Sequence, residues 1–221
     1  MSYRLTKIIL KIGADTEDEY VIEELILKGA DICRLNMAHA DHKWTRTVVK
    51  RINKVCDKVG RRVSIMMDVK GPEIRTGEIS TTYHLDVDDY LEFVTNGHEG
   101  MGDVPAVSVN YPKFSESVKP GETVLVDSGL IRMEVLKVDP DVVRCRVMTP
   151  GPLGSRRHIN LPGIKVDLPA LTEKDKEDVK LGVELGIDFF ALSFVREAKD
   201  IHFLRDYLND LVSPAKIIAK I

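Results

Sequence analysis

The sequence predicts an α/β fold: an incomplete (β/α)8 barrel of about five strands, interrupted by an inserted all-β barrel. Two observations support this prediction. Apolar runs alternate with amphipathic helical patterns over residues 1–72, and the same alternation resumes over residues 167–221. Between these segments, residues 73–166 show no helical period and are rich in glycine and proline, which indicates strands joined by turns.

The segment 1–72 contains the first three predicted strands and the first two predicted helices. Thr16 and Glu19 have the spacing of a capping box, so the first helix is expected to begin there. The second helix places Trp44 and other apolar residues at every third or fourth position, which predicts a buried face. The predicted strands are residues 5–12, 31–36 and 62–68, and the second predicted helix is 41–59.

Alternation of apolar and polar residues characterises the insertion. Arg144 and Arg146 alternate with apolar neighbours, and we expect both to lie on the polar edge of a hairpin. Arg156 and Arg157 leave two interpretations open, a polar hairpin edge or a contact with a ligand. The predicted strands include residues 123–127, 131–135 and 143–147.

The βα pattern resumes after the insertion. Thr172 and Asp175 form a second capping-box pattern, which predicts a helix that continues to Leu185. The remaining predicted elements are a strand at 187–193, a helix at 197–210 and a strand at 216–221.

Composition excludes several classes of protein. The 32 Lys and Arg against 35 Asp and Glu give a formal net charge of −3, which lacks the basic excess of a dedicated nucleic-acid binder. No apolar run approaches the ~18 residues of a membrane span, and no signal peptide is evident, so we expect a cytoplasmic protein. The 3 cysteines form no CxxC pair, and Cys33 is expected to be a small buried apolar residue.

Polar residues follow the predicted parallel strands. In a barrel of this kind, the functional groups lie at the carboxyl ends of the strands. These ends carry Arg34 and Asn36, Asp68 and Lys70, Ser193 and Arg196, and Lys220. Such a set suits a multiply charged anion beside a metal ion, as phosphoryl transfer requires. There is no P-loop motif.

His39 and His42 admit two interpretations. They lie three residues apart at the start of the second predicted helix, where they either ligate a metal ion or form an ordinary solvated first turn.

Several segments, taken in order, resemble the pyruvate kinase family. Arg34–His39 reads Arg-Leu-Asn-Met-Ala-His and is similar to a family motif. Asp68–Gly77 is similar to the segment that precedes the family's lid domain, and Gly154–Gly163 is similar to part of that lid. Val166–Asp175 resembles the return into the barrel, and Lys216–Ile221 resembles the strand with the catalytic lysine.

The resemblance implies an activity and a set of roles. The family transfers the phosphoryl group of phosphoenolpyruvate to ADP in glycolysis, forming pyruvate and ATP, with Mg²⁺ and K⁺, as a homo-oligomer (a tetramer) in the full-length form. Arg34 would hold the transferring phosphate, Lys220 would stabilise developing charge, and Ser193 would lie beside it. The remaining implied residues are Asn36, Asp68 and the Val69 carbonyl for K⁺, and Arg75 and Arg156, with His39 nearby, for the nucleotide.

The sequence also departs from the family pattern. Ala38 replaces a serine and so weakens the expected K⁺ site, and Lys11 and Ala14 replace a threonine and a proline. Because the family's magnesium ligands would follow Ile221, we expect these 221 residues alone to be inactive. The alternative is a non-catalytic relative of pyruvate kinase that binds a nucleotide or a phosphorylated metabolite.

Overall fold

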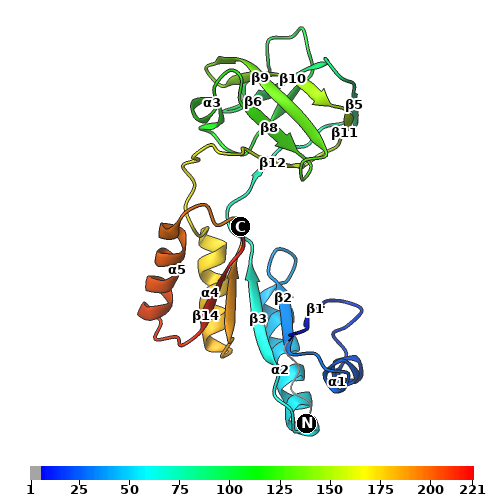
Figure 1. Ribbon diagram of the computed structural model, residues 1–221, viewed down its shortest axis with the longest axis vertical. Helices are drawn as coiled ribbons and strands as arrows, with labels where there is room; N and C mark the ends of the chain where they lie inside the picture. The colour runs from blue at the N-terminus through cyan, green and yellow to red at the C-terminus, as the bar shows by residue number, and fades with distance from the viewer. Residues whose placement is uncertain (1–5) are drawn as a thin grey trace. The chain divides into compact units, whose positions relative to one another are not determined.

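The computed structural model describes residues 6–221 and divides them into two compact units (Figure 1). The α/β unit comprises the described residues up to Pro72 together with Pro169–Ile221. The β unit comprises Glu73–Leu168 and is therefore an insertion in the chain of the α/β unit. Leu5, at the start of the first predicted strand, lies outside the described residues.

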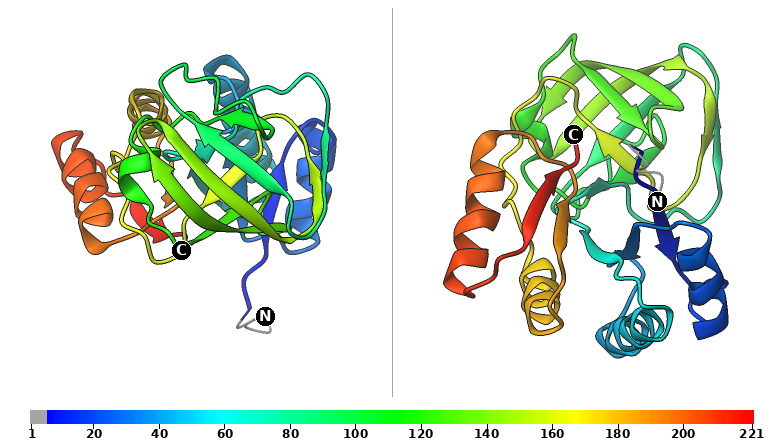
Figure 2. Two further views of the ribbon diagram at one scale, coloured as in Figure 1. Left: turned by 90° about the horizontal axis from the view of Figure 1, so that it is seen from above. Right: turned by 60° about the horizontal axis from the view of Figure 1, so that its bottom comes forward.

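The α/β unit contains one sheet of five parallel strands in the order β1-β2-β3-β13-β14. The strands neighbour one another in chain order, as in a barrel, whereas the order reverses in a doubly wound sheet. Figure 2 shows the helices outside the curved sheet, so the expectation of a partial barrel is confirmed. The strands are β1 (Ile9–Ile12), β2 (Ile32–Asn36), β3 (Ser64–Val69), β13 (Phe189–Leu192) and β14 (Lys216–Ala219). The helices are α1 (Glu19–Leu27), α2 (His42–Val59), α4 (Glu173–Glu184) and α5 (Ala198–Asp210).

Helix α2 begins and ends at residues that the sequence identifies. The Asp41 carboxylate accepts a hydrogen bond from the Trp44 backbone N–H at 2.7 Å, and Gly60 ends the helix in the left-handed conformation. Val48, Ile52 and other apolar residues of the helix are buried in the core against the strands.

The predicted start of helix α1 is wrong. Asp18, not Thr16, is the N-cap residue, and its side chain makes no capping hydrogen bond. The Thr16 hydroxyl instead accepts the Gly13 N–H at 2.9 Å and donates to the Lys11 carbonyl at 3.2 Å. The hydroxyl therefore closes the turn after strand β1 and is not available to cap a helix.

Helix α4 has the predicted capping box, and it lies unusually close to the sheet. The Asp175 N–H donates to the Thr172 hydroxyl at 3.2 Å, and the Asp175 carboxylate accepts the Thr172 N–H at 2.8 Å. A Cβ atom at Gly182 would lie 2.6 Å from the Phe190 ring and 3.1 Å from the Met67 sulfur. Glycine therefore allows the helix to approach strands β3 and β13.

We predict that Gly182→Ala destabilises the α/β unit. Alanine is the better helix former by about 1 kcal/mol, but overpacking a core costs about 1–3 kcal/mol. Because the added Cβ would lie only 2.6 Å from the Phe190 ring, we expect a cost near the upper end and a net loss of up to about 2 kcal/mol. Chemical denaturation of the variant should show a lower midpoint. Lys180→Ala, on the exposed side of the same helix, is the control; an unchanged midpoint for Gly182→Ala would contradict the close packing.

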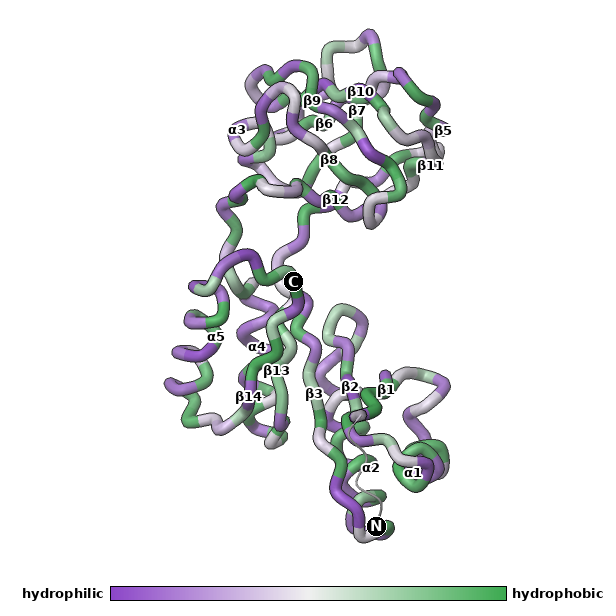
Figure 3. Tube along the Cα trace, in the orientation of Figure 1, coloured by the Kyte–Doolittle hydropathy of each residue, from purple (hydrophilic) through white to green (hydrophobic). Residues whose placement is uncertain are grey.

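The core of the α/β unit lies between the strands and the helices. Figure 3 shows strand β14 mostly in the hydrophobic colour and helix α5 alternating in colour from turn to turn, as an amphipathic helix does. Cys33 is only 1% exposed, and its burial, with a smaller effect of Cys56, raises the pKa of its thiol to about 12. The expectation that Cys33 is a small buried apolar residue is confirmed. Burial also raises the pKa of Cys145 in the β unit.

These pKa values predict the reactivity of the thiols. The thiolate is the reactive form, and at about pH 8 it is nearly absent from Cys33 and Cys145. In the folded protein, a thiol reagent should modify Cys56 and spare Cys33 and Cys145, which should react only after unfolding. Mass spectrometry of the labelled peptides measures this directly, and rapid labelling of Cys33 in the folded protein would contradict it.

The β unit consists of a seven-stranded sheet in the order β4-β12-β8-β9-β10-β6-β7 and the two-stranded pair β11-β5. The Thr76–Val109 bridge, together with the Gly77 N–H donating to the Ser108 carbonyl at 2.7 Å, joins the two ends of the large sheet. One short helix, α3 (Phe114–Ser117), was not expected. The strands are β4 (Ile74–Arg75), β5 (Tyr83–Leu85), β6 (Tyr90–Val94), β7 (Ala106–Ser108), β8 (Thr123–Val126), β9 (Ile131–Asp139), β10 (Val142–Thr149), β11 (Gly151–Leu153) and β12 (His158–Asn160).

The edge position expected for Arg144 and Arg146 is wrong. Their strand, β10, is central and pairs with β9 on one side and β6 on the other. Arg144 forms an ion pair with the fully buried Glu92 at 2.7 Å, and Arg146 forms one with Glu134 at 2.8 Å. The polar alternation therefore marks one face of a central strand and not an edge.

Candidate functional site

Four polar side chains meet at the carboxyl ends of the parallel strands, and we call them the strand-end cluster: Arg34, Asp68, Ser193 and Lys220. Arg34 and Asp68 belong to β2 and β3, Ser193 directly follows β13, and Lys220 directly follows β14. The parallel register places Ala191 of β13 beside Asp68 and beside Ile218 of β14. Residues 152 positions apart in sequence are thereby brought into hydrogen-bond contact.

The Asp68 carboxylate is the centre of the strand-end cluster. Lys220 Nζ lies 2.8 Å from Asp68 Oδ1 and 2.9 Å from Oδ2, and it also donates to the Ser193 hydroxyl at 2.9 Å. The Ser193 hydroxyl donates to Asp68 Oδ1 at 3.1 Å. Arg34 Nε donates to Asp68 Oδ2 at 2.7 Å, and Arg34 Nη2 contacts the same oxygen. The structure thus brings together the three catalytic residues that the resemblance implies.

The charge of the cluster favours an anion. Two cations, Arg34 and Lys220, share a single carboxylate, so one positive charge is left uncompensated within the cluster. The Asp68 side chain is 3% exposed, whereas those of Arg34 and Lys220 are 31% and 42% exposed. Both cations are therefore held in place by a buried acid while part of each remains accessible, an arrangement that suits binding of a phosphate or carboxylate group.

The predicted cation ligands lie at the same strand ends. Asn36 is the register partner of Asp68, and its side-chain oxygen accepts the Ala38 N–H at 3.2 Å. The Val69 carbonyl accepts the Ser193 N–H at 3.3 Å. The donors are all oxygen atoms, which fits the chemistry of a hard cation, and each carbonyl oxygen keeps a second lone pair.

His39 and His42 have different surroundings. His39 is exposed, whereas His42 Nε2 lies 2.8 Å from the Asp178 carboxylate. Within residues 6–221, no three or more His, Cys, Asp and Glu side chains are grouped so that they could hold a metal ion. Asp178 did not stand out in the sequence, because one of its two partners, His42, is 136 positions away.

The exit of strand β3 packs tightly against the exit of strand β13. Gly71 has a φ of +69°, and a Cβ atom there would lie 2.9 Å from the Ser193 carbonyl oxygen. Its N–H donates to the Asp175 carboxylate of helix α4 at 3.2 Å. A glycine at this position therefore permits the close approach that sets the position of the Ser193 backbone.

The two arginines expected to contact a nucleotide are neighbours within the β unit. Arg75 donates to Glu73 Oε2 at 2.5 Å and to the Arg156 carbonyl at 2.7 Å. The hydrogen bond that Arg75 donates to Glu73 raises the pKa of Arg75. The Arg156 guanidinium contacts Glu78, and the Arg156 backbone has a φ of +55°. Each arginine thus has a glutamate partner that a phosphate group would have to replace.

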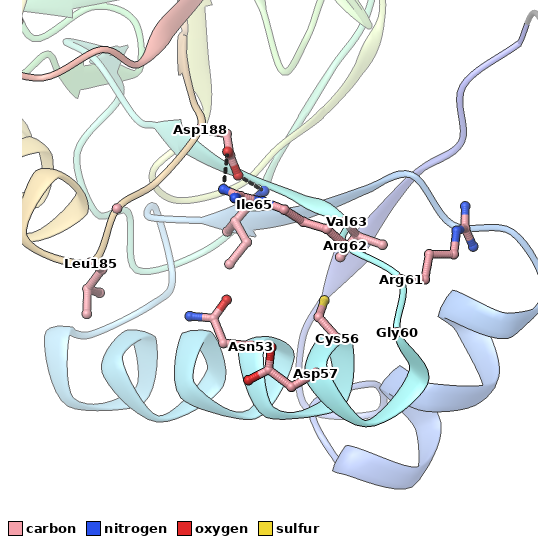
Figure 4. A pocket seen from close by; sticks show the side chains of 11 residues that line it. Asn53, Cys56, Asp57, Gly60, Arg61, Arg62, Val63, Ile65, Leu185 and Asp188 are labelled. Carbon is pink, nitrogen blue, oxygen red and sulfur yellow. Dashed lines mark hydrogen bonds and ion pairs between the residues drawn. The ribbon is translucent and has the colours of Figure 1, made fainter.

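A cavity of about 660 Å³ lies at the opposite, amino-terminal ends of β3 and β13 (Figure 4). Its polar wall includes Arg62 and Asp188, which form an ion pair at 3.1 Å. Arg61 points away from the other lining residues and contacts the Ile26 carbonyl of helix α1. Arg62 at this end thus has one carboxylate partner of its own, whereas in the strand-end cluster two cations share a single carboxylate.

The fold and the strand-end cluster define a (β/α)-barrel protein with a cationic site at the carboxyl ends of its strands. The family described as "Pyruvate kinase, barrel domain" matches residues 3–221. The chain belongs to the pyruvate kinase family.

Individual relatives agree with this assignment. A pyruvate kinase of Eimeria tenella is 39% identical over 98% of this chain and 41% of its own length. Plastidial pyruvate kinase 3, chloroplastic, of Arabidopsis thaliana is 38% identical over 100% of this chain and 38% of its own. A pyruvate kinase of Staphylococcus aureus (strain USA300) is 34% identical over 99% of this chain and 37% of its own. The chain thus spans about two fifths of the length of these relatives.

Proposed function

We propose that this chain carries the phosphoenolpyruvate site of a pyruvate kinase, which transfers a phosphoryl group from phosphoenolpyruvate to ADP and forms pyruvate and ATP. The observation that carries the proposal is the convergence of Arg34 and Lys220 on the buried Asp68 carboxylate at the strand ends. A phosphoryl group in transfer carries several negative charges, and prepositioned cations stabilise them without reorganisation.

Each member of the strand-end cluster has a proposed role. Arg34, with its planar guanidinium, binds two oxygens of the transferring phosphate. Lys220 stabilises negative charge on the phosphoryl and enolate oxygens, and the Ser193 hydroxyl keeps its ammonium in place through the 2.9 Å hydrogen bond. Asp68 orients both cations and lowers the energetic cost of holding them close together.

We propose K⁺ and Mg²⁺ as the metal ions of the reaction. Asn36, Asp68 and the Val69 carbonyl would hold K⁺, with Ala38 offering no hydroxyl ligand. Because Asp68 already faces two cationic side chains, K⁺ would be bound well only together with an anionic substrate. When bound, Mg²⁺ would neutralise negative charge on the phosphoryl oxygens. No residue of this chain is assigned to Mg²⁺.

The β unit is proposed to act as the lid of the active site, with Arg75 and Arg156 as contacts for the nucleotide phosphates. Support comes from its separate core and from its insertion between strand β3 and helix α4, a few residues after the site residues Asp68 and Val69. A lid that excludes water protects a phosphoryl group from hydrolysis.

A cytoplasmic location and a homotetrameric assembly remain predictions. Among residues 6–221, no helix has the length and apolar character needed to cross a bilayer. One of the relatives is named as a chloroplastic protein.

A non-catalytic binding protein is the second candidate function. It is favoured by Ala38, whose side chain offers no oxygen where the family pattern has a serine. This candidate shares the Arg34 and Lys220 site but predicts binding of a phosphorylated metabolite without turnover.

A coupled assay for pyruvate formation separates the two candidates. The natural gene product at its full length should form pyruvate from phosphoenolpyruvate and ADP in the presence of Mg²⁺ and K⁺, and formation should depend on both ions. The 221-residue polypeptide is expected to show no turnover and serves as a second sample. Binding of phosphoenolpyruvate by the full gene product without pyruvate formation would favour the non-catalytic candidate.

A further inference from the structure

Asp178 of helix α4 is a fully buried acid with two cationic or proton-donating partners: Lys174, four residues earlier in the same helix, and His42 of helix α2. The Asp178 side chain is 0% exposed. Oδ2 accepts a hydrogen bond from Lys174 Nζ at 2.6 Å, and Oδ1 lies 2.8 Å from His42 Nε2. A carboxylate can only accept, so His42 Nε2 carries the proton in this contact. Burial of the carboxylate is tolerated because both of its oxygens are hydrogen-bonded.

Lys174 connects this acid to the loop that follows strand β2. Its Nζ donates to the Met37 carbonyl at 2.9 Å while it also contacts Asp178. Met37 directly follows Asn36, and the loop continues through His39 to the start of helix α2. Two further bonds shape the loop, since the His39 and Ala40 N–H groups both donate to the Asn36 carbonyl at 3.2 Å.

We propose that Asp178 is a positioning residue of the phosphoenolpyruvate site, which acts through Lys174 to fix the loop that follows Asn36 and contains His39. The inference rests on the proposed function for the identity of the site. The Lys174 side chain is 54% exposed, so without a buried counter-charge its ammonium would gain more freedom and hydration by leaving the Met37 carbonyl. Asp178 holds it there and also draws His42, the first residue of helix α2, toward helix α4.

The position of the loop matters for the strand-end cluster. The Met37 N–H donates to the Asp68 carbonyl at 3.0 Å, so the loop is bonded to the residue that holds Arg34 and Lys220. Displacement of the loop would move Asn36 relative to its register partner Asp68. A shift of ~1 Å in catalytic groups can lower a rate by about a hundredfold.

Amide hydrogen exchange tests this proposal without reference to activity. In Asp178→Asn, protection of the His39 and Ala40 amides should fall about tenfold relative to that of Ile26 in helix α1, because loss of a charge-assisted contact opens the loop locally. Lys174→Met should give the same fall. Its half-exposed site is tolerant of substitution, so this variant carries the test if Asp178→Asn does not fold.

Lys180→Met is the matched control for Lys174→Met, because Lys180 is a second lysine of helix α4 and pairs with Glu177 instead of Asp178. It should leave the protection ratio unchanged. In the natural gene product, Asp178→Asn and Lys174→Met should lower kcat of pyruvate formation by similar factors.

The outcomes separate the proposal from the proposed function. An unchanged protection ratio in Asp178→Asn or in Lys174→Met overturns the positioning role, whether or not pyruvate is formed. Altered protection with unchanged kcat overturns the link between the loop and the site. Absence of pyruvate formation by the unmodified gene product overturns the proposed function, and with it the assignment of Asp178 to a phosphoenolpyruvate site.

Discussion

Lys220→Met is expected to lower pyruvate formation by the natural gene product about 100- to 1,000-fold, the range found when one prepositioned donor to a developing negative charge is removed. Methionine keeps most of the length of the side chain but has no ammonium to interact with the phosphoryl and enolate oxygens. The fold should persist, because strand β14 is held by its backbone pairing with β13 from Lys216 to Ala219.

Lys216→Met provides the matched control for this prediction. Lys216 is exposed and lies at the other end of the same strand, away from the strand-end cluster. Its substitution should leave both kcat and KM unchanged. Equal activity of Lys220→Met and the unmodified protein would refute the assigned role of Lys220.

Glu92→Leu is expected to cause the largest loss of stability, about 3 kcal/mol or more, the range for removing one partner of a buried ion pair. Glu92 is 0% exposed, and Oε1 accepts hydrogen bonds from Arg144 Nε at 3.0 Å and Nη2 at 2.7 Å. Oε2 accepts the Met101 N–H at 2.7 Å. The substitution leaves the Arg144 guanidinium with Asp103 alone and the Met101 N–H without its acceptor.

Glu134→Leu is the control for Glu92→Leu. Glu134 of strand β9 pairs with Arg146, which lies on strand β10 as Arg144 does. Both Glu134 and Arg146 have side chains that are more than a third exposed. Its loss should lower the free energy of unfolding far less, because exposed ion pairs contribute little. Similar losses for the two variants, measured by chemical denaturation, would show that burial of the Glu92 pair is not what stabilises the β unit.

Much of the α/β unit could be predicted because its signals are local. The apolar period of helix α2 and its ends at Asp41 and Gly60 depend only on neighbouring residues, as does the capping box of Thr172 and Asp175. Thr16 misled the prediction because a hydroxyl can close a turn as readily as it can cap a helix, and its choice of Gly13 depends on the path of the chain.

The sequence was sufficient to predict which residues lie at the site, but not how their side chains contact one another. Parallel strands bring their carboxyl ends together, so Arg34, Asp68, Ser193 and Lys220 were expected at one edge. Asp68 lies between the two cations because of the directions of the side chains and the register of the strands. Neither can be predicted from a local sequence pattern. The buried Asp178 was missed for the same reason.

The β unit shows how long-range pairing limits sequence reasoning. The alternation around Arg144 is equally compatible with an edge strand and with one face of a central strand. Only the pairing of β10 with both β6 and β9 separates these alternatives. Glu92 gave no sign of burial, because its partner lies 52 residues away.

A crystal structure of the natural gene product with bound phosphoenolpyruvate would show whether the strand-end cluster is the substrate site. We expect phosphate oxygens within about 3 Å of both the Arg34 guanidinium and the Lys220 ammonium, with Asp68 still contacting at least one of them. Phosphoenolpyruvate bound in the cavity beside Arg62 and Asp188, or elsewhere without contact to Arg34 and Lys220, would contradict it.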